Sequence, residues 1–253
     1  MHVGLTMASN KLTDYQRLFV GMSKNYGSKY ALIRLIYFIT KASYFKIKPQ
    51  CAQDEIIDIQ LGNKFNHVVR SSENPDICEL DAKDTENHVP VESAIFHKAL
   101  KAAKIAPHDY TFIDIGSGLG KACLLASQYD FPNILGIELA ENLHKQSLDN
   151  LNDYTELTGI KPPIQFINSN ALELKLPPGN LCIYLNKPFS DAIMEKFLSL
   201  LNQSTNMHNH HVVVLNIFPY EPSVFSQFKN LIRVQYVRVD NVEHSWQIYK
   251  NRV

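Results

Sequence analysis

The sequence predicts an α/β protein with a mostly parallel β-sheet, and three observations support this class. An apolar, β-favouring segment at 111–115 runs directly into Gly116, Gly118 and Gly120 and then into helix-forming residues, a pattern typical of a strand, a tight turn and a helix start. Further strand-length segments alternate with helical patterns at spacings that require parallel crossovers. Two final strand candidates joined by a polar turn at 240–244 predict an antiparallel C-terminal hairpin.

Seven strands are predicted between residues 88 and 253, together with the helices that connect them. A helix at 93–104 precedes the first strand and a helix at 141–158, closed by Gly159, follows the second. A further helix continues through residues 193–201 after the fourth strand. The predicted strands, in order, span 111–115, 134–138, 164–168, 181–185, 212–218, 233–239 and 245–250.

The N-terminal third differs in pattern, and residues 1–87 are therefore predicted to be a helical and irregular extension of the 88–253 domain. Residues 13–47 show a wide apolar face, typical of an amphipathic helix. Such a helix docks on its own domain, binds a membrane surface through residues 29–48, or binds a partner helix. The apolar stretch is interrupted by charges and falls short of the roughly 20 residues that span a bilayer.

Opposite charges separate within this extension, although the formal net charge of the chain is zero. Residues 11–48 hold eight Lys or Arg and one acid, whereas residues 52–92 hold ten acids and three bases. The basic segment either faces an anionic surface, or the two segments pack together or lie in solvent. The acidic stretch contains two candidate short strands, at 54–61 and 65–69. No strong nucleic-acid signal follows.

The cysteine and histidine patterns argue against a disulfide framework and against a metal site. The four cysteines form no CxxC pair, and the N-terminus lacks a long apolar signal segment, so we expect reduced, buried thiols in a cytoplasmic protein. His208, His210 and His211 lie in a polar loop without supporting Cys or acidic spacing. No metal site is predicted.

Three ligand classes bind glycine-rich turns of this kind, and the spacing separates them. A phosphate-binding P-loop needs glycine at position 115, which is Ile115, and Ser or Thr at position 122, which is Ala122. A dinucleotide fingerprint needs glycine at position 121, which is Lys121. The observed GxGxG matches the pattern used for S-adenosylmethionine. Glu138, at the end of the next strand, lies where ribose hydroxyls are bound.

The runs DYTFIDIGSGLGKACLLAS, ILGIELAENL and IYLNKPF resemble the class I S-adenosylmethionine-dependent methyltransferases. More narrowly, they are similar to a largely uncharacterised bacterial group with GxGxG and YxNPF-type motifs. The resemblance covers about residues 88–220. It implies a Rossmann-like, seven-stranded sheet whose last pair is antiparallel, with S-adenosylmethionine above the ends of the first strands, and an enzyme that transfers a methyl group.

The resemblance also implies a set of cofactor contacts along this sequence. The methionine portion would contact Asp114, Gly116, Ser117 and Gly118, while Gly120 would admit close packing. Glu138 would accept hydrogen bonds from both ribose hydroxyls, since a carboxylate accepts two bonds side by side. Asn170, followed by Ala171, would meet the adenine amine through its side-chain carbonyl.

The fourth-strand motif carries the tentative catalytic residues Asn186, Pro188 and Phe189. Related methyltransferases read Asn-Pro-Phe, whereas this chain has Lys187 between the asparagine and the proline. In amide- and adenine-amine methyltransferases an Asn-Pro-Pro-Tyr-like motif accepts hydrogen bonds from the target nitrogen, and an aromatic ring stacks beside it. Lys187 either enters the site, where it would repel a cationic acceptor or bind an acidic one, or points to solvent.

The resulting functional prediction is a methyltransferase with an unidentified acceptor, either a protein lysine, another amine or a small molecule. The altered motif keeps a second class open, a non-catalytic Rossmann-like binding protein that acts through the basic N-terminal helix. Methyl transfer depends mainly on alignment of the nucleophile and exclusion of water, so the lack of an evident general base does not exclude an enzyme.

Overall fold

The computed structural model describes residues 57–58, 61–65, 91–208, 211–220, 222–226, 228, 230–237 and 245–251. The predicted amphipathic helix at 13–47 and the polar turn at 240–244 lie outside these residues, as does most of the acidic segment. Residues 29–48, for which membrane-surface binding is one of three predicted alternatives, lie outside them as well. The chain divides into two compact units, Met1–Gly62 with Asp149–Pro162, and Asn63–Leu148 with Pro163–Val253. The second unit holds the whole sheet and every predicted site residue.

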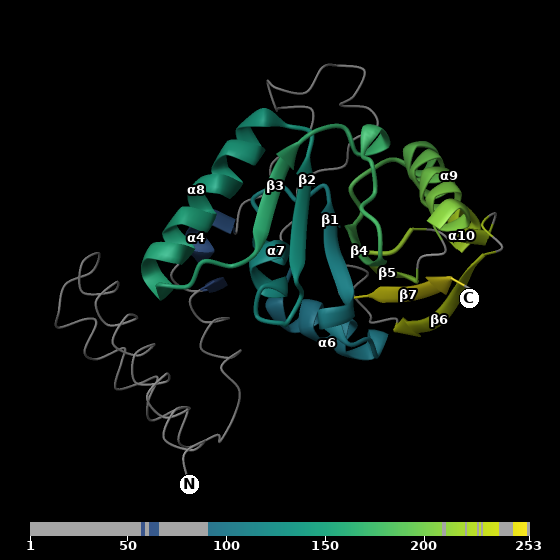
Figure 1. Cartoon of the computed structure of the whole chain (residues 1–253), viewed down its shortest axis with the longest axis horizontal. Coiled ribbons are helices and arrows are strands. Elements are labelled where there is room, and N and C mark those ends of the chain that lie inside the picture. Colours follow the sequence, from purple (N-terminus) through teal and green to yellow (C-terminus); the bar gives the residue numbers. More distant parts are fainter. Residues whose placement is uncertain are drawn as a thin grey trace, which may run out of the picture. The chain divides into compact units, whose positions relative to one another are not determined.

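The second unit is built on a seven-stranded sheet with the order β3-β2-β1-β4-β5-β7-β6, which runs from left to right in Figure 1. Strands β1 to β5 are parallel, and β7 pairs antiparallel with both β5 and β6. This confirms the mostly parallel sheet and its antiparallel end. The strands are Tyr110–Ile115 (β1), Asn133–Glu138 (β2), Ile164–Asn168 (β3), Asn180–Asn186 (β4), Val212–Ile217 (β5), Leu231–Val237 (β6) and Trp246–Asn251 (β7).

Helices cover both faces of the sheet, so the central strands read as nearly continuous apolar runs. On one face Phe96 of α6 packs edge-on against Phe112 of β1, and its ring also lies 5.5 Å from that of Tyr184 in β4. On the opposite face α9 packs against β1 and β4. The described helices are Gly62–Phe65 (α4), Ser93–Ala103 (α6), Lys121–Ala126 (α7), Glu141–Thr158 (α8), Asp191–His208 (α9) and Pro222–Ser226 (α10).

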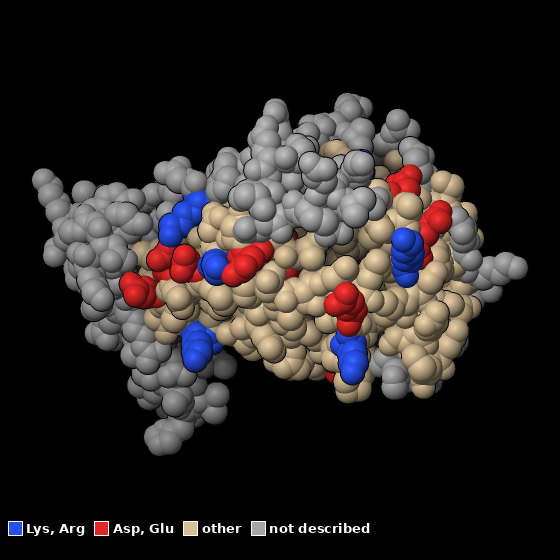
Figure 2. All heavy atoms as spheres, turned by 90° about the horizontal axis from the view of Figure 1, so that it is seen from above, with Lys and Arg blue, Asp and Glu red and all other residues tan. Residues whose placement is uncertain are grey.

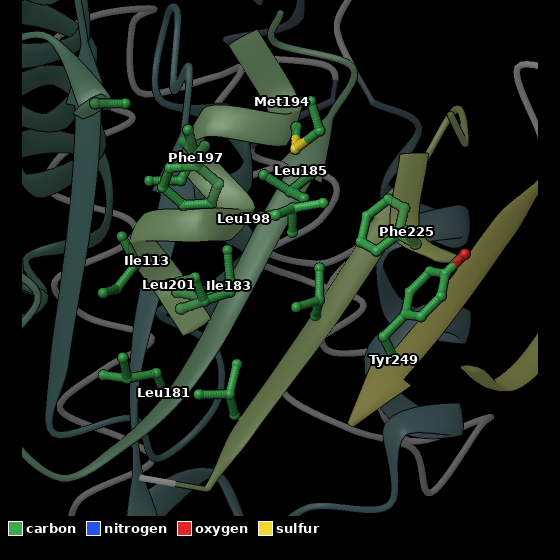
Figure 3. Packing of buried hydrophobic residues seen from close by; sticks show 14 of the residues in the cluster. Ile113, Leu181, Ile183, Leu185, Met194, Phe197, Leu198, Leu201, Phe225 and Tyr249 are labelled. Carbon is green, nitrogen blue, oxygen red and sulfur yellow. The ribbon is translucent and has the colours of Figure 1, made fainter. Parts of the chain in front are cut away.

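The core beneath α9 is continuous from the centre of the sheet to its antiparallel end (Figure 3). Phe197 and Leu198 point from α9 toward Ile183 of β4, and all three side chains are fully buried. Farther along, Phe225 of α10 stacks on Tyr249 of β7, with ring centroids 4.0 Å apart. This packing covers β4 and β5 on the face of the sheet that α9 and α10 occupy.

Local pattern predicted several element bounds closely, whereas α9 is longer than the predicted 193–201 and β6 begins two residues before the predicted 233. Helix α8 and strand β3 have the predicted bounds, while β5 ends at Ile217, one residue before the predicted end. Cys123 and Cys182 are buried free thiols, as expected. The strand expected at 54–61 is wrong at its described positions, because residues 57–58 are in a π-helical turn and α4 follows.

The physical reason for this error is visible in the burial pattern. Ile57, Leu61 and Phe65 are all buried and stand four residues apart, which is the spacing of one helix face rather than of a strand. The candidate strand at 65–69 fails at Phe65 for the same reason, since Phe65 ends α4.

The described surface carries charges of both signs. In Figure 2, basic and acidic side chains alternate over the described part of the face seen from above. Within the residues that the structure describes, no helix is long and apolar enough to cross a membrane.

Candidate functional site

The predicted site residues converge at the carboxyl edge of the sheet, where the strand order changes direction. From β1 the chain proceeds to β2 on one side, while β4 pairs with β1 on the other. In open α/β sheets, ligands bind outside the carboxyl ends of strands at such a switch point. The glycine turn follows the end of β1 at Ile115, and the 186–189 segment begins at the end of β4.

Hydrogen bonds attach the glycine turn to the end of β2. The backbone N–H groups of Gly116 and Ser117 both donate to the carbonyl oxygen of Ile137, each at 2.9 Å. The N–H of Gly118 donates to Oε2 of Glu138 at 2.7 Å, and the N–H of Ala140 donates to Oε1 at 2.9 Å. The Glu138 carboxylate therefore joins the turn after β1 to the loop after β2.

Glu138 keeps the capacity to bind a ligand as well as the turn. Each carboxylate oxygen has two acceptor positions, and the hydrogen bonds from Gly118 and Ala140 take one position on each oxygen. Burial raises the pKa of Glu138, and hydrogen bonds from the backbone of Ala140, Gly118 and Leu139 act in the opposite direction. Additional donors, such as two neighbouring hydroxyls, would favour the charged form further.

Close approach to neighbouring side chains explains why two turn positions are glycine. A Cβ on Gly116 would lie 2.6 Å from Cβ of Pro188, and a Cβ on Gly120 would lie 2.5 Å from Cζ of Phe166 in β3. The first contact brings the glycine turn and the 186–189 segment directly together. The two motifs are far apart in sequence but belong to one site.

Ser117 adds a polar group at the same turn. Its side chain is buried, and its Oγ lacks a hydrogen-bond partner among the described residues. A buried hydroxyl without a partner is energetically costly. A ligand that hydrogen-bonds at the turn would satisfy it.

Asp114 lies one layer below the turn, in the middle of the sheet. Its neighbours across the sheet are Gly136 and Tyr184, and Sγ of Cys123 donates a weak bond to Oδ2 at 3.7 Å. Burial, and next the negative charge of Glu138, raises the pKa of Asp114 to about 8. The carboxyl group is therefore mostly protonated at neutral pH. Burial raises the pKa of Tyr184, and the Asp114 carboxyl raises it further once it has lost its own proton.

We expect the free energy of unfolding to fall as the pH rises from about 4 to about 8. The folded chain holds the Asp114 proton up to about pH 8, whereas the unfolded chain releases it near pH 4. Between these values the folded state binds more protons, so this group lowers the unfolding free energy by at most about 1.4 kcal/mol per pH unit. Asp114→Asn should flatten that slope in urea unfolding measured between about pH 4 and 9. If the unfolding free energies of wild type and variant change in parallel with pH, Asp114 does not hold a proton in the folded state.

Asn170 and Ala171 follow β3 at the same edge. The Asn170 side chain caps a 3₁₀ turn at Ala171–Glu173, with its Oδ1 accepting from the N–H of Leu172 at 2.9 Å. An adenine amine would therefore share this oxygen with the cap. Ala171 is buried in the core on the α9 side.

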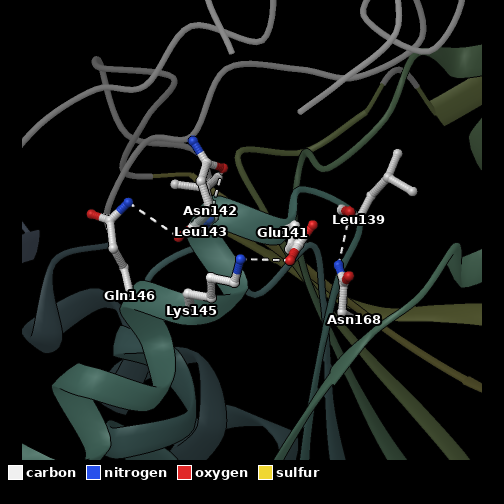
Figure 4. Close-up of polar contacts among 7 residues, drawn as sticks. All are labelled: Leu139, Glu141, Asn142, Leu143, Lys145, Gln146 and Asn168. Atoms are coloured by element: carbon white, nitrogen blue, oxygen red, sulfur yellow. Dashed lines mark hydrogen bonds and ion pairs between the residues drawn. The ribbon is translucent and has the colours of Figure 1, made fainter. Parts of the chain in front are cut away.

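Sequence reasoning missed Asn168, which ties β3 to the loop after Glu138. Its Nδ2 donates to the carbonyl oxygens of Glu138 and Leu139, both at 2.9 Å. Figure 4 shows the second bond beside the start of α8, where Glu141 pairs with Lys145. An asparagine at the carboxyl end of a strand next to the glutamate strand was the available signal.

The 186–189 segment turns sharply after β4. Lys187 adopts a left-handed backbone conformation, with φ of +48°, and its Nζ lies 5.5 Å from the ring centroid of Phe218. The Phe189 ring packs 6.1 Å from that of Phe197 in α9. Lys187 therefore lies against Phe218 at the sheet edge, and the partly buried Phe189 packs against the core beneath α9. Asn186 and Lys187 are half-buried.

Comparison with known proteins gives resemblances of structure only. No protein-family description matches the chain, and no curated protein matches it in sequence. An RNA methyltransferase from Salinibacter ruber in complex with S-adenosyl-L-homocysteine is 17% identical, with a TM-score of 0.46, over 64% of this chain and 92% of that one.

Two other solved structures are similar to the same extent. A putative methyltransferase from Escherichia coli is 19% identical, with a TM-score of 0.47, over 64% of this chain and 87% of that one. Magnesium protoporphyrin IX methyltransferase from Synechocystis, with S-adenosylmethionine bound, is 8% identical, with a TM-score of 0.46, over 62% of this chain and 75% of that one. At these identities the functional conclusion depends on the residues of this chain, and the narrower bacterial group stays a prediction.

Proposed function

We propose that this protein is an S-adenosylmethionine-dependent methyltransferase. The observation that carries the proposal is the contact of the glycine turn with the 186–189 segment through Gly116 and Pro188, at the switch point between β1 and β4. A buried carboxylate, Glu138, is hydrogen-bonded to that same turn. Under this proposal a cofactor site and an acceptor site would lie side by side within the proposed 88–253 domain.

The residues fit S-adenosylmethionine in type and position. Glu138 would accept the ribose hydroxyls on the free positions of its two oxygens. Ser117, whose buried Oγ has no partner among the described residues, would donate to the methionine portion beside Asp114. Asn170 and Ala171 would meet the adenine at the end of β3.

The reaction is a displacement that needs little acid or base chemistry from the protein. When bound, S-adenosylmethionine supplies a sulfonium methyl group, which moves to the acceptor nucleophile while sulfur keeps the electrons of the broken C–S bond and the acceptor loses a proton to solvent. The protein aligns the two partners and excludes water. Asn186, at the end of β4, would hold the nucleophile by accepting a hydrogen bond through its side-chain carbonyl.

We propose an amine as the acceptor, either a protein lysine or the amine of a smaller molecule. The supporting feature is Asn186, whose side-chain carbonyl would accept a hydrogen bond from the target nitrogen, as the related motif does in amide- and adenine-amine methyltransferases. The Phe189 ring packs toward Phe197 but is only partly buried, so its exposed part would stack beside the acceptor.

Calorimetry tests the cofactor assignment directly. The protein is titrated with S-adenosylmethionine, with its demethylated product S-adenosylhomocysteine and with NAD. We expect the first two to bind and NAD not to bind, because the turn lacks the third glycine of a dinucleotide site. No binding of the two sulfur compounds would rule out the proposed function.

Transfer of a labelled methyl group then tests the activity. The protein is incubated with labelled S-adenosylmethionine and a cell lysate, which is resolved into protein, nucleic-acid and small-molecule fractions. Label in the protein or small-molecule fraction is expected for an amine acceptor. Cofactor binding without any transfer would instead support the non-catalytic binding protein.

A further inference from the structure

The ends of β4 and β5 have the same local pattern. Residues 186–189 read Asn-Lys-Pro-Phe, and residues 217–220 read Ile-Phe-Pro-Tyr. Asn186 and Ile217 are paired in the β-sheet, so the following residues start from the same level. Lys187 and Phe218, next in each chain, both adopt left-handed conformations, with φ of +48° and +52°. Each strand thus ends in a left-handed residue, a proline and an aromatic residue.

Side chains keep these two segments together beyond the last backbone pair. The Lys187 ammonium lies over the Phe218 ring, 5.5 Å from its centroid. Two residues later, the hydroxyl of Tyr220 accepts a hydrogen bond from the N–H of Phe189 at 3.0 Å and donates one to the carbonyl oxygen of Phe189 at 2.8 Å. One buried hydroxyl therefore binds both backbone groups of a single residue.

The two hydrogen bonds between the Tyr220 hydroxyl and the Phe189 backbone, here called the clamp, hold an unfavourable backbone conformation in place. A left-handed conformation is unfavourable for residues other than glycine, and the residue before a proline is restricted further. Such conformations persist where the surroundings over-determine them. Here Tyr220, a residue that is only 2% exposed, is held in the core beneath α9 and provides a rigid support.

The clamped segment is the one that contacts the glycine turn. Pro188, directly before Phe189, faces Gly116 so closely that a Cβ there would lie 2.6 Å from it. A shift of Phe189 would therefore move Pro188 and Asn186 relative to the turn. Misplacement of reacting groups by about 1 Å is enough to slow a reaction about 100-fold.

We propose that Tyr220 is a positioning residue for methyl transfer. By binding the backbone of Phe189, it holds residues 186–189 against the glycine turn, in the geometry that presents the acceptor. This inference rests on the proposed methyltransferase function. Tyr220 acts on the acceptor segment and not on Glu138. The rate of methyl transfer therefore depends on its hydroxyl, whereas cofactor affinity does not.

Tyr220→Phe tests this role, since it removes both hydrogen bonds and keeps the ring. Three quantities are measured: the Kd for S-adenosylmethionine by calorimetry, the rate of labelled-methyl transfer over a series of lysate concentrations, and hydrogen exchange of the Phe189 amide. We expect a Kd within about twofold of wild type, a maximal rate lowered about tenfold, and Phe189 exchange accelerated about tenfold, as for loss of one to two hydrogen bonds.

Tyr129→Phe is the matched control. Its hydroxyl lies 2.7 Å from Nδ1 of His97, before the amino end of β2 and away from the carboxyl edge. The same atom is removed, and all three measured quantities are expected to stay at wild-type values. Trp246, the single tryptophan of the chain, is the β-sheet partner of Ile217, so its fluorescence shows that this part of the sheet remains folded.

The possible results separate the inference from the function on which it rests. An unchanged maximal rate in Tyr220→Phe would overturn the positioning role, as would equal losses of rate and of cofactor affinity, which indicate general destabilisation. Absence of cofactor binding in the wild-type protein would overturn the proposed function itself. If Tyr220→Phe does not fold, Lys187→Met replaces the ammonium that lies over the Phe218 ring, and the maximal rate should fall about threefold with unchanged Kd.

Discussion

Replacing Glu138 with alanine is expected to weaken S-adenosylmethionine binding about 100-fold or more. The carboxylate would accept two ribose hydroxyls, and each charge-assisted hydrogen bond contributes roughly 1.5–3 kcal/mol. The substitution also removes the acceptor for Gly118, whose N–H lies 2.7 Å from Oε2, so the turn loses part of its support. Both effects act in the same direction. Calorimetry with the folded variant measures the result.

Glu141→Ala is the control for charge. Glu141 lies three residues later, at the start of α8, and pairs with Lys145 on the surface. Glu141→Ala removes the same charge from the same region without removing a contact with the glycine turn. The cofactor affinity should stay within about twofold of wild type, because exposed ion pairs contribute little. Equal affinities for wild type and Glu138→Ala would show that the ribose does not bind at the end of β2.

Gly116→Ala is expected to destabilise the protein by roughly 2–5 kcal/mol. The residue has φ of +73°, a conformation that costs an L-residue about 1–2 kcal/mol. Its new Cβ would also lie 2.6 Å from Cβ of Pro188, and overpacking of this kind costs roughly 1–3 kcal/mol. Because the strain is relieved by separating the turn from residues 186–189, methyl transfer should be lost even under conditions in which the variant is folded.

Gly179→Ala separates the two causes. Gly179 has φ of +91°, but a Cβ there would meet no atom within 4 Å. Only the backbone cost applies, so urea unfolding should show a loss of about 1–2 kcal/mol and methyl transfer should continue. If the two variants lose equal stability, the close contact of Gly116 with Pro188 does not exist in solution.

Local periodicity accounts for most of the fold that could be predicted. The bounds of α8 and β3 follow from residues that repeat at helical or strand spacing, and such spacing depends only on the chain itself. The failure at residues 54–61 has the same origin, because Ile57, Leu61 and Phe65 stand at helix spacing within an acidic, weakly patterned stretch. A helical interpretation was available there.

Part of the site was also predictable, for a topological reason. A right-handed crossover places β2 beside β1 with its carboxyl end at the same edge, so Glu138 and the glycine turn were expected to be neighbours. The hydrogen bond between Gly118 and Glu138 shows that they are. Their role toward a ribose stays a prediction that the Glu138 variant tests.

The sequence by itself determined the strand-turn-helix around Gly116 to Gly120, the parallel alternation and the carboxylate that follows the second strand. Only the tertiary structure decided that Pro188 meets Gly116, that Tyr220 clamps Phe189, and that Asp114 holds its proton to about pH 8. The physical reason is that periodicity and turn chemistry are local, whereas contacts and burial depend on which strands become neighbours and in which register. The path of the chain brings β4 beside β1 and β5 beside β4, and the chemistry of the edge follows from that arrangement.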